Sequence, residues 1–308
     1  MHPTSPLSSP ENVSMAVESI VSTRAAGTLP FAREGSMDAQ RMLHRRRVLA
    51  ATAAVALARS AKAQTEQPDP WPSLSAQIFN GRPIVNGSTA LAIDAPYRAI
   101  DAAAVPVIIH TLLPPDDARS IRSITLTIDE NPSPLAAVFT FGAGSGVRTL
   151  AMRLRVDSYT NLHAVAELGD GQLYGVARFV KASGGCSASP AKAEASSIPL
   201  GAMRFVQVPP AAAAEDMRRE AELTIHHPNY TGMQMDQLTR LYVPAHFVTA
   251  VRIWQGDQPL LSIDCGISIS ENPEFRFDYR PNGAASFRVE AADNEGHEFK
   301  DQWPVTRV

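Results

Sequence analysis

Residues 261–270 read Leu-Ser-Ile-Asp-Cys-Gly-Ile-Ser-Ile-Ser, the most regular pattern in the chain. Apolar residues take every second position, and Ser, Asp or Gly takes the positions between them. Because successive side chains of a strand point to opposite faces of the sheet, this alternation predicts a β-strand with one face in a core. Cys265 lies on the apolar face, so we expect a structural thiol that packs as a small hydrophobe.

Similar alternation recurs on both sides of this stretch, and Gly, Pro, Asn and Asp residues separate the segments. Short strands at this spacing, without helical patterns of about 10 to 15 residues between them, favour antiparallel sandwiches over a parallel α/β sheet. The sequence therefore predicts an all-β protein with two β-sandwich domains in tandem. The predicted strands are 105–113, 123–128, 135–141, 152–157, 162–168, 173–180, 201–208, 223–225, 247–254, 261–270, 275–279, 286–291 and 299–305.

The glycine-rich segment 142–146 raises the question of a phosphate-binding loop or a nucleophile elbow. It reads Gly-Ala-Gly-Ser-Gly, which has the spacing of neither motif, and it joins two strand patterns instead of opening a helix. We expect a hairpin loop.

The second cysteine, Cys186, has surroundings opposite to those of Cys265. Residues 183–197 contain only Gly, Cys, Ser, Ala, Pro, Lys and Glu, so no large apolar side chain anchors them to a core. Glycine has no Cβ to exclude left-handed conformations, and this composition predicts a flexible arm that exposes the thiol. An incidental linker thiol or half of a disulfide is the alternative, which composition leaves open. The small residues that give the arm its freedom are Gly184, Gly185, Ser187 and Ala188.

Only Lys181 lies near enough in sequence to lower the pKa of Cys186, so a strongly activated thiol is not evident. Four histidines, at positions 226, 227, 246 and 297, have the spacing of no known metal-ligand motif. No arrangement of Ser, His and Asp stands out either. The sequence therefore predicts no metal, no cofactor and no catalytic residues.

The chain of 308 residues is 44% hydrophobic and 19% charged, enough to bury a sizeable core. Acidic residues outnumber basic ones by 31 to 28, which argues against a nucleic-acid or anionic-membrane surface. No apolar run reaches the roughly 18 to 20 residues of a spanning helix, so we expect no membrane insertion after processing.

The N-terminal region predicts an export signal of the twin-arginine type. Arg45-Arg46 precede an apolar run at residues 48–58, and Ala61-Lys62-Ala63 has the form of a cleavage site. We expect cleavage near Ala63 and a mature protein in a bacterial periplasm. Residues 1–36 would make an unusually long charged region, so we also expect translation to start later than Met1.

Both halves are similar to a known family. The first half, with its Cys186 arm, resembles the Y subunit of the SoxYZ carrier of bacterial sulfur oxidation, and the second half resembles the Z subunit. The resemblance covers nearly the whole mature chain. It rests on Asp94-Ala95-Pro96, Val105-Pro106-Val107 and Gly184-Gly185-Cys186 in the first half, and on His227-Pro228, Thr231-Gly232, Val243-Pro244-Ala245-His246-Phe247, Asn272-Pro273, Asp293-Asn294 and Gly296 in the second.

This resemblance implies two immunoglobulin-like domains and a non-catalytic periplasmic carrier, on which Cys186 holds sulfur intermediates such as those of thiosulfate oxidation. Its partners would be sulfur-oxidation enzymes, c-type cytochromes or a quinoprotein dehydrogenase, since the fused arrangement is similar to SoxYZ-like carriers associated with quinoproteins. The family arm ends its chain in Gly-Gly-Cys-Gly-Gly, whereas here Ser187 and Ala188 follow the cysteine and the chain continues. A doubly tethered arm has a shorter reach.

We therefore expect a signal region (1–63), a linker (64–72), a SoxY-like sandwich (73–181), a flexible cysteine arm and linker (182–198) and a SoxZ-like sandwich (199–308). The two sandwiches should pack together through their sheets, with the arm outside their interface. The alternative function is an immunoglobulin-like interaction module or chaperone for a periplasmic quinoprotein dehydrogenase, in which Cys186 is incidental.

Overall fold

Strands form nearly all the regular structure in the computed structural model, which describes residues 68–114, 119–189, 198–208 and 218–306. The predicted export signal and residues 64–67 of the predicted linker lie outside these residues, while the last two linker residues, Trp71 and Pro72, begin a helix. The elements are α2 (Trp71–Ile78), β1 (Ile84–Asn86), β2 (Leu91–Asp94), β3 (Val105–Thr111), β4 (Ile121–Ile128), β5 (Leu135–Phe141), β6 (Thr149–Leu154), β7 (Thr160–Leu168), β8 (Leu173–Val180), β9 (Met203–Val208), β10 (Arg219–Ile225), β11 (Val248–Gln255), β12 (Gln258–Cys265), β13 (Glu274–Tyr279), β14 (Ser286–Asp293) and β15 (Glu298–Pro304).

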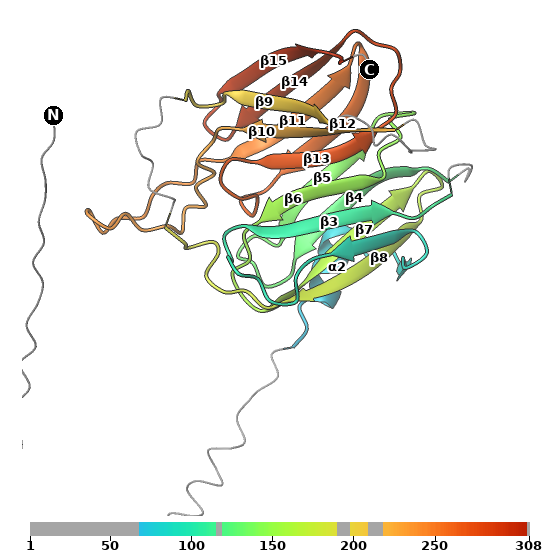
Figure 1. Cartoon of the computed structure of the whole chain (residues 1–308). Coiled ribbons are helices and arrows are strands. Elements are labelled where there is room, and N and C mark those ends of the chain that lie inside the picture. Colours follow the sequence, from blue (N-terminus) through green and yellow to red (C-terminus); the bar gives the residue numbers. More distant parts are fainter. Residues whose placement is uncertain (1–67, 115–118, 190–197, 209–217, 307–308) are drawn as a thin grey trace, which may run out of the picture. The chain divides into compact units, whose positions relative to one another are not determined.

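The strands form two sheets that face each other (Figure 1). The larger sheet has the order β1-β8-β7-β4-β5-β12-β11-β14-β15, and the smaller sheet has the order β2-β3-β6-β13-β10-β9. The first half of the chain contributes β1 to β8, and the second half contributes β9 to β15. Each half is therefore a two-layer β-sandwich, which confirms the predicted fold class.

The two halves meet edge to edge within both sheets. β5 pairs with β12 in the larger sheet, and β6 pairs with β13 in the smaller one, both antiparallel. Phe139 lies opposite Ile263 across the first junction, and both side chains are fully buried. One hydrophobic core runs through both halves, and Pro68–Val308 forms one compact unit. The halves do meet through their sheets, as expected, but by strand pairing at the edges.

Alternating burial along the strands agrees with the sequence pattern. In β14 every second residue is buried and each residue between is half-buried, as expected for a strand with one face in a core. The predicted strand 261–270 is too long, because β12 ends at Cys265. The backbone of Gly266 approaches the carbonyl of Leu135 so closely that no Cβ would fit there, and the chain turns away.

Three elements and one connection differ from the sequence prediction. The helix α2 and the short strands β1 and β2 were not predicted. The loop 142–146 is not a hairpin, because the strands it joins, β5 and β6, lie in different sheets. Gly142 passes against the carbonyl of Pro259, where a side chain would clash, so the glycine serves a crossing between the two layers.

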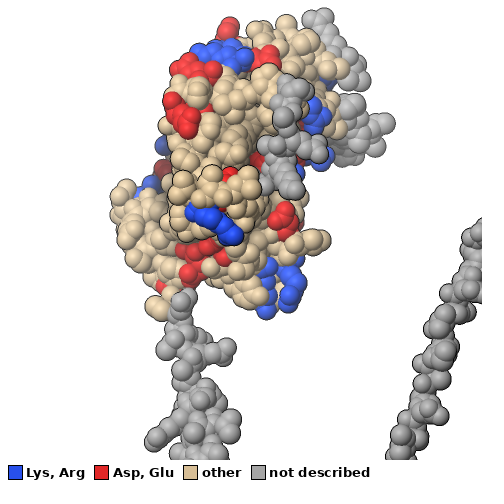
Figure 2. Space-filling model, turned by 90° about the vertical axis from the view of Figure 1, so that its left-hand side faces the viewer, with Lys and Arg blue, Asp and Glu red and all other residues tan. Residues whose placement is uncertain are grey.

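None of the helices in the described part of the chain is long and apolar enough to cross a membrane. Positive and negative side chains lie in small groups separated by uncharged surface on the face shown in Figure 2.

Candidate functional site

Cys186 lies just after β8, in a short turn that returns the chain against its own half. Its residue has no exposed surface in the structure. The expectation of an exposed thiol is therefore wrong for this conformation. The predicted arm continues beyond Ser189 into residues 190–197, which lie outside the described part of the chain.

Backbone hydrogen bonds hold the turn against the segment that follows β6. Gly184 donates its N–H to the carbonyl of Asp157 at 2.8 Å, and Gly185 donates to the carbonyl of Val156 at 3.1 Å. The N–H of Cys186 donates to Asp157 Oδ1 at 3.2 Å. The turn is thus a defined structure, and its position depends on residues about 30 positions earlier in the sequence.

The two glycines have structural roles that differ from the flexibility predicted for them. Gly184 has a φ of +77°, a conformation that glycine adopts without strain. Gly185 packs so closely on the carbonyl oxygens of Ala102 and Val156 that a Cβ would overlap both. Ser187 is exposed, with its hydroxyl 3.4 Å from the carbonyl of Gly184, and Ala188 is half-buried. The glycines allow the turn to pack closely.

Arg155 is a buried cation beside this turn, and sequence reasoning missed it. The residue is 2% exposed, and its Nη1 donates to the carbonyl of Gly185 at 3.2 Å. Its Nε finds no hydrogen-bond partner within the described residues. Burial lowers the pKa of Arg155, while Glu271, Cys186 and Asp101 oppose that shift. The positive charge next to Cys186 therefore comes from the residue that directly follows β6, about 30 positions earlier in the sequence.

Lys181, which the sequence suggested as the activating residue, is engaged elsewhere. Its ammonium lies 4.9 Å from the ring centre of Tyr97 and 5.9 Å from that of Tyr159, distances typical of cation–π contacts.

The seated thiol of Cys186 stays protonated at neutral pH. Burial and, to a smaller extent, the carboxylate of Asp157 raise its pKa to about 12, against the opposing effect of the Arg155 guanidinium. Since only the thiolate attacks sulfur, this conformation stores the thiol in an inert form.

The second half of the chain completes the seat of Cys186. Thr231 donates its hydroxyl to the carbonyl of Cys186 at 2.6 Å, and its own N–H is held by Gln234 Oε1 at 2.9 Å. Both halves therefore contact the turn that carries Cys186. The prediction that the arm lies outside the interface between the halves is wrong for this turn. We call this group of Arg155, Asp157 and Thr231 the Cys186 seat.

Cys265 lies at the end of β12, opposite Ala137 in β5, and packs against the common core. Burial raises its pKa to about 12, with Asp264 adding to the shift and Arg252 opposing it. The residue is half-buried at the end of its strand, less buried than the predicted core position implies. Both cysteines are free in the structure.

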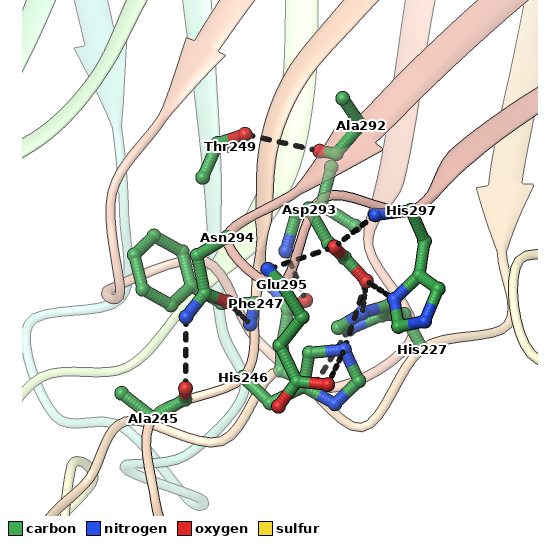
Figure 3. A network of polar contacts seen from close by, with 12 residues as sticks. His227, Ala245, His246, Phe247, Thr249, Ala292, Asp293, Asn294, Glu295 and His297 are labelled. Atoms are coloured by element: carbon green, nitrogen blue, oxygen red, sulfur yellow. Dashed lines mark hydrogen bonds and ion pairs between the residues drawn. The ribbon is translucent and has the colours of Figure 1, made fainter.

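A second polar cluster gathers around Asp293, at the end of β14 (Figure 3). His246 Nε2 and His297 Nδ1 each lie 2.8 Å from Asp293 Oδ2, and His227 Nε2 lies 3.5 Å from the same oxygen. Sequence reasoning found no site among these histidines, because they are distant in sequence and it overlooked Asp293. His226 is not among the residues whose ligand atoms converge there. We call His227, His246, Asp293, Glu295 and His297 the Asp293 cluster.

Asp293 is fully buried at its carboxylate, and burial alone would raise its pKa. Hydrogen bonds from His246, from both the backbone and the ring of His297, and from the backbone of Glu295 outweigh this effect and lower the pKa. The side chain is therefore a carboxylate at neutral pH. Burial and the nearby His246 lower the pKa of His227, which keeps that imidazole neutral.

In comparisons with known proteins, both halves match families of sulfur oxidation proteins. A family model for sulfur oxidation protein SoxY matches residues 75–186, so that its last matched residue is Cys186. A model for sulphur oxidation protein SoxZ matches residues 206–304. A search of the curated proteins finds no match.

Similar solved structures include the sulfur carrier protein SoxY from Chlorobium limicola f thiosulfatophilum. It is 30% identical to this chain, with a TM-score of 0.30, and the match covers 37% of this chain and 91% of that one. A superoxide reductase (neelaredoxin) from Ignicoccus hospitalis is 20% identical with a TM-score of 0.27, and the match covers 30% of this chain and 79% of that one. With its two family matches in sequence order, this chain belongs to the SoxY and SoxZ families of sulfur oxidation proteins, and carries one domain of each.

Proposed function

We propose that this protein is a non-catalytic carrier that holds a sulfur-containing group covalently on Cys186. The observation that carries the proposal is the position of Cys186. It ends the SoxY match, and residues of both domains build its seat. A cysteine that only filled a core would need neither a glycine turn nor a seat shared between two domains.

The exchange chemistry needs no cofactor beyond the adduct itself. In loading, the Cys186 thiolate attacks a sulfur atom of an activated donor such as a persulfide or thiosulfonate, and a new S–S bond forms. The old bond of the donor breaks, and its other fragment leaves with the electron pair. In unloading, a client thiolate attacks the carried group in the same manner and Cys186 leaves as a thiolate. Electrons balance in both steps.

Arg155 is suited to an anionic cargo. Its guanidinium acts on Cys186 electrostatically, and its Nε–H finds no acceptor among the described residues. Arginine binds oxyanions and sulfur anions through several N–H groups at once. A negatively charged group on the Cys186 sulfur would thus find a cation already in place.

The carrier has to work in two states. In the seated state the thiol is buried and protonated, which protects it from unwanted oxidation. For transfer the turn has to leave the seat, so that the thiol reaches solvent and ionises. The hydrogen bonds of the turn to Val156, Asp157, Arg155 and Thr231 would break, and each is worth about 0.5–1.5 kcal/mol, or more where a charged group takes part.

The predicted twin-arginine signal supports a location in the periplasm. There the protein would exchange its cargo with sulfur-oxidation enzymes, or with a c-type cytochrome or quinoprotein dehydrogenase. The two domains pair within the chain, so these partners would be additional proteins.

One observation favours the alternative function as an interaction module: the buried thiol with its raised pKa has the properties of a structural cysteine. Intact-mass spectrometry of the protein taken from its own periplasm separates the two. The carrier function predicts adducts on Cys186 that dithiothreitol removes and that Cys186→Ser abolishes. Cys265→Ser is the matched control and should leave the adducts in place. A uniformly unmodified thiol that also fails to react with persulfide or thiosulfonate donors would contradict the carrier function.

A further inference from the structure

The Asp293 cluster takes no part in the proposed sulfur chemistry, and none of its side chains contributes to the Cys186 seat. Three segments bring it together (Figure 3). The end of β14 and the turn after it supply Asp293, Glu295 and His297 at every second position, the segment before β11 supplies His246, and the segment after β10 supplies His227. Asp293 Oδ1 accepts the N–H groups of Glu295 and His297 at 2.9 Å each, which fixes the turn. The geometry of these side chains is thus set by the backbone.

The cluster holds two overlapping groups of three possible ligand residues, which are His227, His246 and Asp293 in one group and His246, Glu295 and His297 in the other. His246 Nε2 and His297 Nδ1 each lie 2.8 Å from Asp293 Oδ2, and Glu295 Oε2 lies 3.7 Å from His246 Nε2. The ligand atoms of His246, Glu295 and His297 all lie within 4.8 Å of one another. A tetrahedral zinc ion with bonds of about 2.0–2.1 Å needs its ligands about 3.3 Å apart, so Asp293 Oδ2 would move away from each of the two histidine nitrogens by roughly half an ångström.

Asp293 Oδ2 has three histidine nitrogens around it but only two lone pairs to offer. His227 Nδ1 accepts the N–H of Asn229 at 3.1 Å, so a neutral His227 carries its proton on Nε2. That buried Nε2 finds no hydrogen-bond partner within the described residues, although it points toward Asp293 Oδ2 at 3.5 Å. Without an ion, two neighbouring histidines occupy the oxygen and one buried N–H is left over.

An ion relieves this conflict. His246 and His297 would then bind the ion through their lone pairs, and Asp293 Oδ2 would use one of its own. Its other lone pair becomes available to His227 Nε2–H, and a hydrogen bond to a ligating carboxylate is the usual support of a metal site. The fixed tautomer thus makes His227 a supporting residue and leaves the ligand positions to the other members of the cluster.

Charge and access also fit an ion. Two neutral imidazoles and two carboxylates balance a divalent charge, and nitrogen with oxygen ligands suits zinc and its neighbours better than magnesium or calcium. Asp293 is fully buried at its carboxylate, while the side chains of Glu295 and His297 are 48% and 50% exposed. The cluster therefore has a rigid inner side and an outer side through which an ion can enter.

We propose that the Asp293 cluster binds one divalent transition-metal ion, with zinc as the best match. The ligand atoms are His246 Nε2, His297 Nδ1, Asp293 Oδ2 and Glu295 Oε2. The backbone of His246 pairs in both directions with Tyr230, the neighbour of Thr231 in the Cys186 seat. The ion would therefore brace the loop on which that seat depends.

Calorimetric titration of the chelator-treated protein with ZnCl2 tests the proposal. The Cys186→Ser protein is used, so that the thiol cannot compete for the ion and a failure of the carrier function does not affect the result. We expect one zinc ion per chain. His297→Gln and Glu295→Gln should each weaken binding by about tenfold or more, because even the loss of a supporting hydrogen bond costs roughly 10- to 100-fold.

His226→Gln is the matched control, since it removes a histidine adjacent to the cluster and should leave affinity and stoichiometry unchanged. Circular dichroism verifies that each variant is folded. Should His297→Gln unfold, Glu295→Gln decides, because its side chain is half-exposed and its backbone N–H remains in place. Absence of binding at millimolar zinc, or equal binding by folded Glu295→Gln and the parent protein, would overturn the proposal.

Discussion

The backbone of Cys186 is held on both sides of its Cα. Its N–H donates to Asp157, and its carbonyl accepts the hydroxyl of Thr231. Sequence composition predicted an exposed thiol at Cys186, and the structure shows a buried one. The residues that bury it are its neighbours in space only, and nothing in residues 183–197 encodes them.

Loss of the Thr231 hydroxyl should loosen the seat without disturbing the fold. Thr231→Val keeps the shape of the side chain but leaves the carbonyl of Cys186 without that donor. One hydrogen bond is worth about 0.5–1.5 kcal/mol, so the thiol should be alkylated about 3- to 10-fold faster at pH 8. Thr249→Val is the control, since Thr249 donates to the carbonyl of Ala292. Equal labelling rates for both variants would show that Thr231 does not hold the seat.

Both cysteines should make the protein less stable in alkali. Their pKa is about 12 in the folded state, chiefly because of burial, against about 9 in the unfolded chain. The folded protein keeps protons that the unfolded chain releases, so the free energy of unfolding falls as pH rises from about 9 to 12. The limit is about 1.4 kcal/mol per thiol for each pH unit. Urea unfolding at pH 8 and pH 10 measures it, and the double variant Cys186→Ala, Cys265→Ala should show a clearly smaller loss.

Among the elements, the longer strands were predictable because alternation of apolar and polar residues reports a sheet with one buried face. β5 and β8 begin and end as predicted. The helix α2 was missed, since it has only eight residues, two of which are Trp71 and Pro72, and none of its residues is buried. Its position depends on Trp71, whose ring stacks on His163 with centroids 3.6 Å apart. Such a contact between distant residues leaves no periodic signal in the sequence.

The turn that carries Cys186 should tolerate no side chain at Gly185. In Gly185→Ala the new Cβ meets the carbonyl oxygens of Ala102 and Val156, and overpacking of this kind costs about 1–3 kcal/mol. The turn should therefore leave its seat more often, and Cys186 should be alkylated faster. Gly171→Ala is the contrast, because that glycine has a φ of +84° but open space around it. It should lower stability through strain alone, about 1–2 kcal/mol, and leave the labelling of Cys186 unchanged.

On the scale of the whole molecule, two strand pairings join the SoxY and SoxZ domains. The sequence predicted two sandwiches and their pairing, but it could not show which edges meet. The sequence of an edge strand does not identify the strand with which it pairs, because the pairing uses backbone groups that every strand has. The alternation of apolar and polar residues in β12 would fit an outer strand equally well. The same limit hid the Asp293 cluster, whose members come from separate segments that only the fold unites.

Cleavage of the chain between the domains should leave them together. A protease cut within residues 190–197 leaves every strand of the described residues uncut, so β5–β12 and β6–β13 still join the fragments. We expect the two fragments to co-elute in gel filtration and to separate only in denaturant. Fragments that elute apart in buffer would show that the shared sheets contribute little to stability.

Because β5 and β12 pair within one chain, dilution does not separate the two domains that build the Cys186 seat. A seat assembled from two separate chains would be lost whenever their concentration fell below the dissociation constant of the pair. Here the partners share one polypeptide, so the second domain is present at a fixed effective concentration. Each cysteine therefore keeps its own Thr231, at a ratio of one to one, whatever the level of expression.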